Sequence, residues 1–282
     1  MKRTKSFESD NNILYLVSTP IGNMSEVSER TISILSSVDV VAAEDTRNTG
    51  SLLSKLGIKK ELFSLREHNE NEASVHVIEL IKSGKKVAYV SDAGYPGISD
   101  PGYLLVQNAL EEGIRVSTIS GPCAFINALV ASGLETNHFY FHGFLSAKDS
   151  ESKKELALLK DRKETLIFYE SPHRINRMLS NLLEVLGDRK AVIARELTKI
   201  NEEYIRGTLS ELVEIDEATL KGEMVVLVGG NKEELIIDDK TIIERVGYHV
   251  KLGHSKKEAI ELAAKELNVP KNQIKKLILN EK

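Results

Sequence analysis

The chain has 282 residues, of which 41% are hydrophobic and 28% are charged, a composition typical of a globular protein and not of a disordered or fibrous one. No apolar run approaches the length of a membrane span, and the first apolar stretch, Ile13 to Val17, is too short for a signal peptide. The net charge of −4 does not by itself favour nucleic-acid binding, and the single cysteine, Cys123, excludes an intramolecular disulfide. We therefore expect a cytoplasmic protein with no membrane segment and no metal site.

The first half of the chain alternates short apolar runs with amphipathic stretches. The short runs predict strands at residues 13–17, 38–43, 62–65, 87–91 and 115–119. Apolar residues at helical spacing predict helices around residues 32–35, 52–56, 75–84 and 104–113. Because strands that alternate with helices form βαβ units, we expect a mostly parallel sheet.

A turn-rich break near residues 132–138 leads into a less regular second half. Further apolar runs predict strands at residues 138–144, 164–169, 190–194, 202–206 and 223–228. Helices are predicted at residues 149–163 and 173–186, and Ser171 and Pro172 suit the N-cap and first position of the second helix. The N–H groups at such a helix start could receive a phosphate.

The tail from Asp238 has no convincing strand. Ser255 and Glu258 form a predicted capping box at the start of one helix, and residues 268–270 separate it from a second short apolar face. From residue 251 to 282 there are eight lysines and four glutamates, a balance of 8 − 4 = +4. The pair of helices resembles a helix-turn-helix that could contact RNA, although a solvated helical surface would carry the same charges.

The sequence thus predicts an α/β fold with two α/β domains and a small C-terminal helical tail. We assign a disordered N-terminus to residues 1–12 and an N-terminal α/β domain to residues 13–132. A C-terminal α+β domain covers residues 133–234, and a helix-turn-helix-like, RNA-contacting extension covers residues 235–282.

The segments after the strands of the first half are expected to carry the chemistry, because ligands of open parallel sheets bind outside the carboxyl ends of the strands. The strongest signal is DAGYPGISDPG at residues 92–102, whose three glycines and two prolines exceed what a structural turn needs. No G-x-G-x-x-G or G-x-x-x-x-G-K-[ST] motif is present, which argues against a nicotinamide enzyme and a P-loop nucleotidase. Neither H-E-x-x-H, G-x-S-x-G nor a set of residues at metal-ligand spacing occurs.

Eight motifs follow one another along the chain: TPIGN at 19–23, AAEDTR at 42–47, EHN at 67–69, DAGYPGISDPG at 92–102, SGP at 120–122, FYESPHR at 168–174, ARELTK at 194–199 and GEMVVLVGG at 222–230. In this order they resemble the tetrapyrrole methylases, and within them the branch that methylates a ribose of bacterial 16S rRNA. The resemblance covers residues 13 to 230, and the tail is similar to the family's helical extension. It implies a class III methyltransferase, usually a homodimer, with S-adenosylmethionine in a cleft between the two α/β domains.

The resemblance also implies a substrate and a cofactor site. The substrate would be the 2'-hydroxyl of a decoding-centre cytidine, position 1402, of 16S rRNA in the small ribosomal subunit. The implied cofactor-binding residues are Pro20, Gly22, Asp92, Ala93, Gly94, Ile98, Ser99, Gly121, Pro122, Glu223 and Met224. The chain departs from the family pattern at Tyr95, where a small residue is expected, and at Ser120 and Cys123, where proline and serine are common.

A ribose hydroxyl is a poor nucleophile, so methyl transfer to it needs a general base or a cation near the developing alkoxide. The candidate catalytic residues are Glu44, Asp45, Glu67, His68, Glu170 and His173, and the sequence leaves the identity of the base open. The candidate RNA-binding residues are Arg47, Arg174, Arg195, Lys199, Lys256 and Lys257. Simpler roles are a pair between Asp45 and Arg47 and an internal ion-pair network around Glu196.

Three other functions are compatible with parts of this pattern. A methyltransferase acting on a small porphyrinoid would use the same cofactor fold. A ribosome-assembly or RNA-binding module could keep the pocket without catalysis, although the intact loops at 92–102 and 120–122 speak against it. A transcription regulator is suggested only by the helix-turn-helix-like tail.

Overall fold

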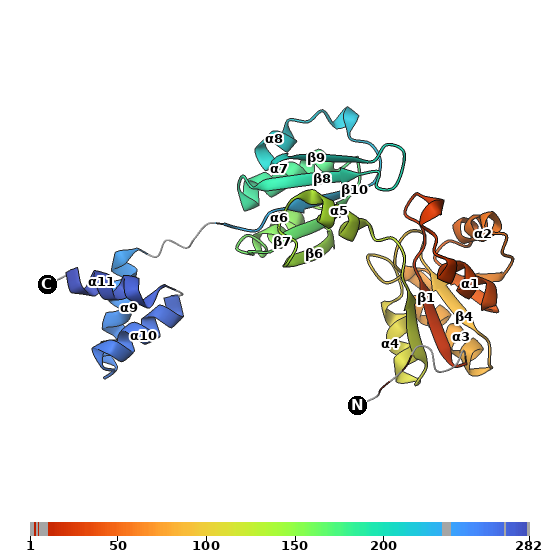
Figure 1. Cartoon of the computed structure of the whole chain (residues 1–282), viewed down its shortest axis with the longest axis horizontal. Coiled ribbons are helices and arrows are strands. Elements are labelled where there is room, and N and C mark those ends of the chain that lie inside the picture. The colour runs from red at the N-terminus through yellow and green to blue at the C-terminus, as the bar shows by residue number, and fades with distance from the viewer. Residues whose placement is uncertain (1–2, 4, 6–10, 233–237, 268, 281–282) are drawn as a thin grey trace. The chain divides into compact units, whose positions relative to one another are not determined.

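The computed structural model describes residues 3, 5, 11–232, 238–267 and 269–280 (Figure 1). The chain divides into two units, residues 1–231 and residues 232–282. No helix among the described residues is long and apolar enough to span a membrane. The predicted disordered segment, residues 1–12, falls largely outside the described residues, as do residues 233–237, where the predicted second domain ends and the extension begins.

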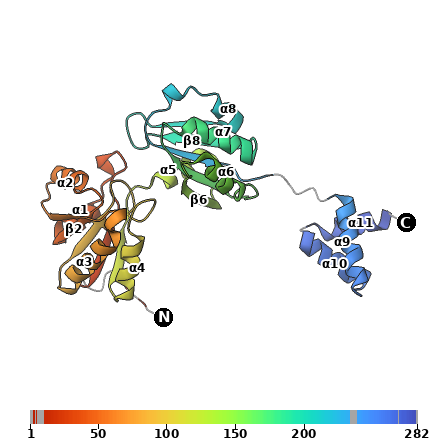
Figure 2. The same cartoon turned by 180° about the vertical axis from the view of Figure 1, so that it is seen from behind.

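The first sheet is entirely parallel, with the strand order β3-β2-β4-β1-β5. Its strands are β1 (Ile13–Val17), β2 (Val40–Ala43), β3 (Glu61–Ser64), β4 (Val87–Val90) and β5 (Arg115–Ile119). The helices between them are α1 (Glu29–Ser37), α2 (Thr46–Lys55), α3 (Glu70–Lys82) and α4 (Tyr103–Glu111). Apolar clusters join α1 and α2 to one face of the sheet and α3 and α4 to the other (Figures 1 and 2). Both faces are covered, so β2 and β4 are apolar and buried at every position, as parallel strands require.

The strand order reverses direction at the centre of this sheet. The chain runs from β1 to β2 and β3 at one edge, then returns through β4 to β5 at the other edge. The segments that leave β1 and β4 therefore diverge, and a crevice of this kind is where open α/β sheets bind ligands. Thr19 and Gly94 join these two segments by a pair of backbone hydrogen bonds of 2.9 and 3.0 Å.

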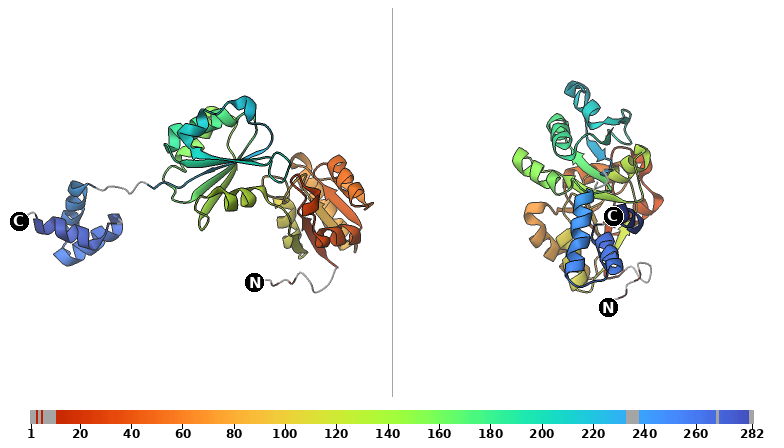
Figure 3. Two further views of the ribbon diagram at one scale, coloured as in Figure 1. Left: turned by 45° about the horizontal axis from the view of Figure 1, so that its top comes forward. Right: turned by 90° about the vertical axis from the view of Figure 1, so that its left-hand side faces the viewer.

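The second sheet is mixed, with the order β6-β7-β10-β8-β9, in which only β6 and β7 are parallel. Its strands are β6 (Phe139–Phe144), β7 (Thr165–Glu170), β8 (Lys190–Arg195), β9 (Glu203–Thr208) and β10 (Met224–Val228). Helices α6 (Asp149–Ala157), α7 (Ile175–Leu186) and α8 (Leu209–Val213) pack on one face, and α5 (Ala124–Ser132) packs on the other (Figure 3).

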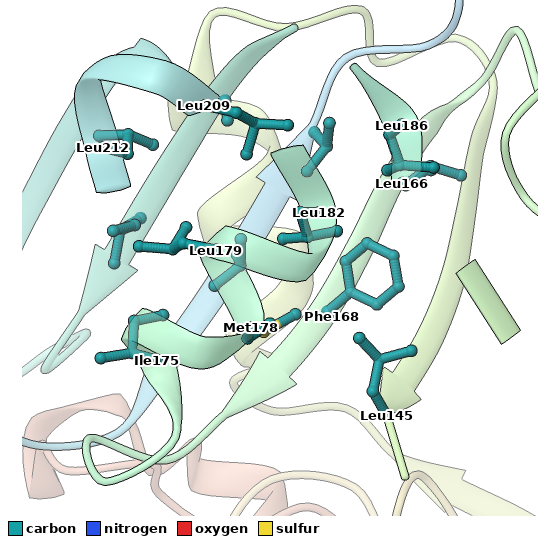
Figure 4. Packing of buried hydrophobic residues seen from close by; sticks show 14 of the residues in the cluster. Leu145, Leu166, Phe168, Ile175, Met178, Leu179, Leu182, Leu186, Leu209 and Leu212 are labelled. Atoms are coloured by element: carbon teal, nitrogen blue, oxygen red, sulfur yellow. The ribbon is translucent and has the colours of Figure 1, made fainter. Parts of the chain in front are cut away.

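Alternation along β10 builds both cores of this sheet. Met224, Val226 and Val228 join the cluster under α7, whereas Val225 and Leu227 join the cluster under α5. Figure 4 shows the first cluster, in which α7 directs Ile175, Met178, Leu179, Leu182 and Leu186 toward Leu166 and Phe168 of β7. The apolar residues of α7 recur every three or four positions, which explains why the sequence predicted this helix.

The unit of residues 232–282 contains three helices among its described residues: α9 (Asp239–Lys251), α10 (Lys256–Leu267) and α11 (Lys271–Asn280). They enclose a small core formed by Ile242, Val246, Ala259, Ile260, Ala263 and Ile274. The capping box is confirmed, because Ser255 N–H donates to Glu258 and Glu258 N–H donates to the Ser255 hydroxyl, at 2.9 and 3.3 Å.

The predicted architecture of two α/β domains and a helical tail is confirmed, with four local differences. The helix predicted at residues 149–163 ends at Ala157, and residues 158–161 form a turn. Helix α5 was not predicted, and it packs on the second sheet although the predicted domain boundary at residue 132 follows it. Helix α9 was not predicted either. The expected helix start at Ser171 and Pro172 was wrong, since α7 begins at Ile175 with Arg174 at the N-cap and residues 172–174 form a turn.

Candidate active site

A cavity of about 370 Å³ lies beside the crevice of the first sheet and is shared with the second sheet. The segments after β1, β2, β4 and β5 contribute Ile21, Glu44, Cys123 and most of residues 92–100. The second sheet contributes Tyr169, Glu170, Glu223, Met224 and Val225, together with Phe144, Ser171, Pro172 and Leu197 from the segments beside them. Five lining residues are carboxylates, and the described lining includes no lysine, arginine or histidine. The cavity is therefore suited to a ligand with apolar parts and a positive charge.

The loop of residues 92–102 is held at both ends. At its start, the hydrogen bonds between Thr19 and Gly94 fix it to the segment after β1. At its end, the buried carboxylate of Glu70 accepts N–H bonds from Gly102, Leu104 and Leu105 at 2.8, 3.0 and 3.4 Å. Gly102, the N-cap of α4, has no side chain to perform this role, so Glu70 caps the helix from α3.

Two features give the same loop its shape inside the cavity. Ser99 has a φ of 62°, a left-handed conformation that costs a non-glycine residue about 1–3 kcal/mol. Tyr95 accepts a hydrogen bond of 3.1 Å from Gly121 N–H and thereby joins the loop to the segment after β5. The departure from the family pattern at Tyr95 is thus a structural link between two walls of the cavity.

Glu44, Asp92 and Asp100 gather three carboxyl groups on the first-sheet side of the cavity. Burial and the charge of Glu44 raise the pKa of Asp100 to about 7, against the opposing hydrogen bond from Ser91. Burial, followed by the charge of Asp92, also raises the pKa of Glu44, although Asp92 N–H donates to its carboxylate at 3.2 Å. Asp92 is an acceptor for Asp45 N–H and the Asn48 amide at 3.2 and 2.9 Å. The sequence did not single out Asp100, the second aspartate of the loop.

Asp45 has a different environment although it is adjacent to Glu44. It caps α2, accepts from Arg47 N–H at 2.8 Å, and pairs with the Arg47 guanidinium at 2.5 Å. Hydrogen bonds from Arg47 hold the pKa of Asp45 far below its usual range. Asp45 is therefore an anion at any physiological pH and serves to fix the start of α2.

On the second-sheet side, Glu170 is buried and forms an ion pair of 3.3 Å with Arg174. Arg174 also donates to the carbonyl groups of Leu145 and Ser146 at 2.8 and 3.2 Å. These bonds join the turn after β7 to the end of β6. Glu170 thus lines the cavity while its charge is balanced by Arg174.

The segment after β8 closes the second-sheet side. Glu196 and Thr198 have φ values of 50° and 69°. Lys199 donates to Glu196 and Glu223 at 2.9 and 3.1 Å, and its hydrogen bond lowers the pKa of Glu196. Arg195 pairs with Glu203 at 2.6 Å and donates to the Lys221 carbonyl at 3.0 Å.

Most of the predicted cofactor-binding residues line the cavity: Asp92, Ala93, Gly94, Ile98, Ser99, Glu223 and Met224. Pro20, Gly22, Gly121 and Pro122 do not line it, although they flank Ile21 and Cys123, which do. Of the predicted catalytic residues, Glu44 and Glu170 line the cavity, whereas Asp45, Glu67, His68 and His173 do not. His68 and His173 are exposed.

The predicted RNA-binding residues fall into two groups. Arg174, Arg195 and Lys199 are engaged by internal acceptors, as described above. Arg47 is paired with Asp45, yet 85% of its side-chain surface is exposed. Lys256 and Lys257 are exposed at the start of α10.

Comparisons with known proteins agree with this geometry. Residues 13–213 match the family described as Tetrapyrrole (Corrin/Porphyrin) Methylases. The ribosomal RNA small subunit methyltransferase I of Bacillus subtilis (strain 168) is 44% identical, and the alignment covers 97% of each chain. The protein of that name from Escherichia coli O157:H7 is 41% identical, over 100% of this chain and 99% of the other.

Solved structures show the same fold at lower identity. The methyltransferase CobJ superposes with a TM-score of 0.59 at 19% identity, over 80% of this chain and 96% of the other. Uroporphyrin-III-C-methyltransferase from Thermus thermophilus gives a TM-score of 0.57 at 20% identity, over 78% and 94%.

Proposed function

This chain belongs to the tetrapyrrole methylase family, with ribosomal RNA small subunit methyltransferases I among its full-length relatives, and we propose that it methylates the ribose 2'-hydroxyl of cytidine 1402 in 16S rRNA. The cofactor of the family is S-adenosylmethionine. The observation that carries the proposal is the acidic cavity at the switch point of the first sheet, whose lining includes residues of the motifs at 92–102, 168–174 and 222–230. Ribosomal subunits as substrate also imply a cytoplasmic location.

The residues that line the cavity fit this cofactor. Five carboxylates line the cavity. Arg174 and Lys199 pair with Glu170 and Glu223 from outside the lining, so Glu44, Asp92 and Asp100 are the groups that favour a positively charged ligand, and S-adenosylmethionine carries a sulfonium. Ala93 offers backbone groups, while Ile21, Ile98, Leu197 and Met224 offer apolar contacts for an adenine ring. The bound cofactor supplies an electrophilic methyl group, so the protein's task is to orient the acceptor and exclude water.

We assign the general base to the pair Glu44 and Asp100. Both line the cavity, and both have raised pKa values, that of Asp100 to about 7. A carboxyl that titrates near the working pH can accept the hydroxyl proton and release it to solvent afterwards. Asp45 is a poor candidate because its pKa is held far below its usual range. Glu170 is also less suited, since Arg174 balances its charge.

The RNA phosphates would be bound by cations outside the cavity. Arg47 is the best placed of the predicted residues near the cavity, because most of its side chain is exposed and Glu44, which lines the cavity, lies three positions before it. Lys256 and Lys257 in the second unit offer exposed charge at a helix start. Arg174, Arg195 and Lys199 already have internal partners, so an RNA contact through them would cost those bonds.

A homodimer is part of the proposal. Ile126 and Val130 of α5 and Phe139 of the neighbouring β6 are 38%, 69% and 41% exposed. Ile126 and Val130 lie four positions apart and so share one face of α5, and exposed apolar faces are typical of protein interfaces. Sedimentation equilibrium should give twice the chain mass for the native protein and a shift to the chain mass for Val130→Asp; a native monomer would disprove this part.

The first experiment is methyl transfer from labelled S-adenosylmethionine to small ribosomal subunits from cells that lack this protein, beside naked 16S rRNA. We expect one labelled nucleotide, at which the RNA resists alkaline cleavage because the 2'-hydroxyl is blocked. Label on a base, or at another nucleotide, would contradict the proposal.

Two glycines with similar backbone conformations provide a matched control. Gly94 (φ 77°) lines the cavity, whereas Gly113 (φ 73°) has no atom within 4 Å of an added Cβ. Gly94→Val should abolish labelling, and Gly113→Val should retain it. The alternative acceptor is a porphyrinoid; methylation of a porphyrinoid without RNA labelling would favour that alternative.

A further inference from the structure

The segment after β8, residues 196–202, has a strained backbone that persists only because neighbouring residues hold it in place. Glu196 and Thr198 both adopt left-handed conformations, and each costs about 1–3 kcal/mol in a residue other than glycine. Three backbone hydrogen bonds of 3.0 Å hold the segment: Glu196 N–H donates to the Glu223 carbonyl, Lys199 N–H to the Glu196 carbonyl, and Glu202 N–H to the Lys199 carbonyl. Thr198 N–H donates to the Glu202 carboxylate at 2.6 Å. Such conformations persist where a precise local shape is functional.

The strained segment lies directly against the segment after β1. A Cβ placed on Gly22 would be 2.5 Å from Cγ of Lys199 and 3.0 Å from Oγ1 of Thr198. The preceding residue in each segment contributes to the cavity: Ile21, before Gly22, and Leu197, before Thr198, both line it. Ile21 also packs against the apolar cluster of the second sheet that contains Leu197. Gly22 thus allows the two sheets to meet beside the cofactor site.

The ammonium group of Lys199 extends this contact to the cavity wall. It donates to Glu196 at 2.9 Å and to Glu223 at 3.1 Å. Glu196 in turn accepts from Glu223 N–H at 3.3 Å. Glu223 and Met224 line the cavity, so one side chain connects Gly22 of the first sheet to the cavity wall of the second.

We propose that Lys199 is a positioning residue for the cofactor: its stem seats the segment after β1, and its ammonium group holds Glu196 and Glu223, which directly precede the cavity residues Leu197 and Met224. This role rests on the proposed use of the cavity by S-adenosylmethionine. It replaces the RNA contact predicted for Lys199 from the sequence. Without the ammonium group, Glu196 and Glu223 lose their shared counter-charge, and this part of the wall is held only by the hydrogen bonds between these two residues and by the pairing of β10.

The test is the Kd for S-adenosylmethionine, measured by titration calorimetry without RNA, in Lys199→Met and in Lys154→Met. Lys154 is an exposed lysine of α6 outside the cavity, so its variant controls for the loss of a charge. We expect Lys199→Met to weaken cofactor binding by about tenfold and Lys154→Met to leave it unchanged. At saturating cofactor, the kcat of Lys199→Met should stay near that of the native protein, which a general loss of structure would not allow.

Two further measurements separate this role from its alternatives. The salt dependence of small-subunit binding should be unchanged in Lys199→Met; a slope reduced by about one, with native cofactor affinity, would show an RNA contact instead. Gly22→Ala should weaken cofactor binding, and adding Lys199→Ala should cost less than the sum of the two changes, because the clash with Cγ is removed. Strict additivity would overturn the proposed contact. A native protein that binds cofactor but does not label rRNA would refute the proposed function and leave this inference intact.

Discussion

Asp100 and Asp45 are both aspartates at the carboxyl edge of the first sheet, yet their surroundings shift their pKa values in opposite directions. Burial and the charge of Glu44 raise the pKa of Asp100 to about 7, whereas hydrogen bonds from Arg47 lower the pKa of Asp45. A base must be unprotonated to act. The rate of methyl transfer should therefore rise with pH, pass through a midpoint near 7, and reach a plateau above it.

This dependence can be measured in single turnovers at saturating cofactor from pH 5.5 to 9. We expect Asp100→Asn to lower the plateau rate by about 100-fold or more and to abolish the midpoint near 7. Asp45→Asn, which keeps a good N-cap, should retain the midpoint. If Asp100→Asn keeps both the rate and the midpoint, Asp100 is not part of the base.

Residue type and position identified much of the cavity from the sequence. Glu44, Glu170 and seven of the cofactor residues implied by the resemblance line it. Glu44 and five of these cofactor residues, from Asp92 to Ser99, follow strands that the apolar pattern predicts, whereas Glu223 and Met224 lie at the start of β10 and were predicted from the resemblance alone. Asp100 was not predicted as a site residue because its raised pKa depends on burial, and no periodic sequence pattern predicts which residues of an eleven-residue loop are buried. His68 and His173 are suitable residue types at strand ends, but they lie on the exposed surface, and their catalytic role stays a prediction.

At the scale of the element, Glu70 caps the N-terminus of α4, and no sequence pattern near α4 predicts this contact. The cap is a glycine, and the acceptor comes from the start of α3. We expect Glu70→Ala to lower the free energy of unfolding by about 2–3 kcal/mol, since three buried N–H groups lose their acceptor. Urea denaturation would measure this loss.

Two variants control for this effect. Glu72→Ala removes an exposed carboxylate from the same turn of α3 and should change stability by less than about 0.5 kcal/mol. Glu70→Gln keeps one acceptor oxygen and should fall between the two. Equal losses for Glu70→Ala and Glu72→Ala would rule out the capping role.

The helices that the sequence missed have physical explanations. α5, with the sequence AFINALVAS, is apolar on nearly every side and so shows no amphipathic period. α9 does have buried residues at helical spacing, since Ile242, Val246 and His249 lie four and three positions apart. The charged residues between them make this pattern hard to recognise in the sequence. The start of α7 was misplaced because Ser171 and Pro172 suit a cap, whereas the Ser171 hydroxyl instead donates to the Glu170 carboxylate at 3.4 Å.

At the scale of the whole molecule, the second unit has its own core and concentrates exposed lysines. We expect the double variant Lys256→Glu and Lys257→Glu to weaken small-subunit binding and to reduce the slope of log K against log salt by about two. The Kd for S-adenosylmethionine should stay the same, since the cavity lies within residues 1–231.

Lys265→Glu, at the other end of α10, is the matched control. It changes the net charge of the same helix without altering the predicted contact. Because Lys265→Glu reverses one charge where the double variant reverses two, a slope that falls by about one with Lys265→Glu would indicate a general effect of charge and not a docking site.

The strand order of both sheets also governs how the chain can fold as it is synthesised. β1 lies between β4 and β5, and β10 lies between β7 and β8. Each sheet thus depends on a pairing between segments that are made far apart in time, and such distant pairings slow folding. Until Val228 has emerged from the ribosome, the nascent second sheet consists of two strand pairs with open inner edges. Translation that stops before β10 would leave those edges free to aggregate. The second sheet is therefore complete only after β10 has been synthesised, and until then the nascent chain is a substrate for chaperones.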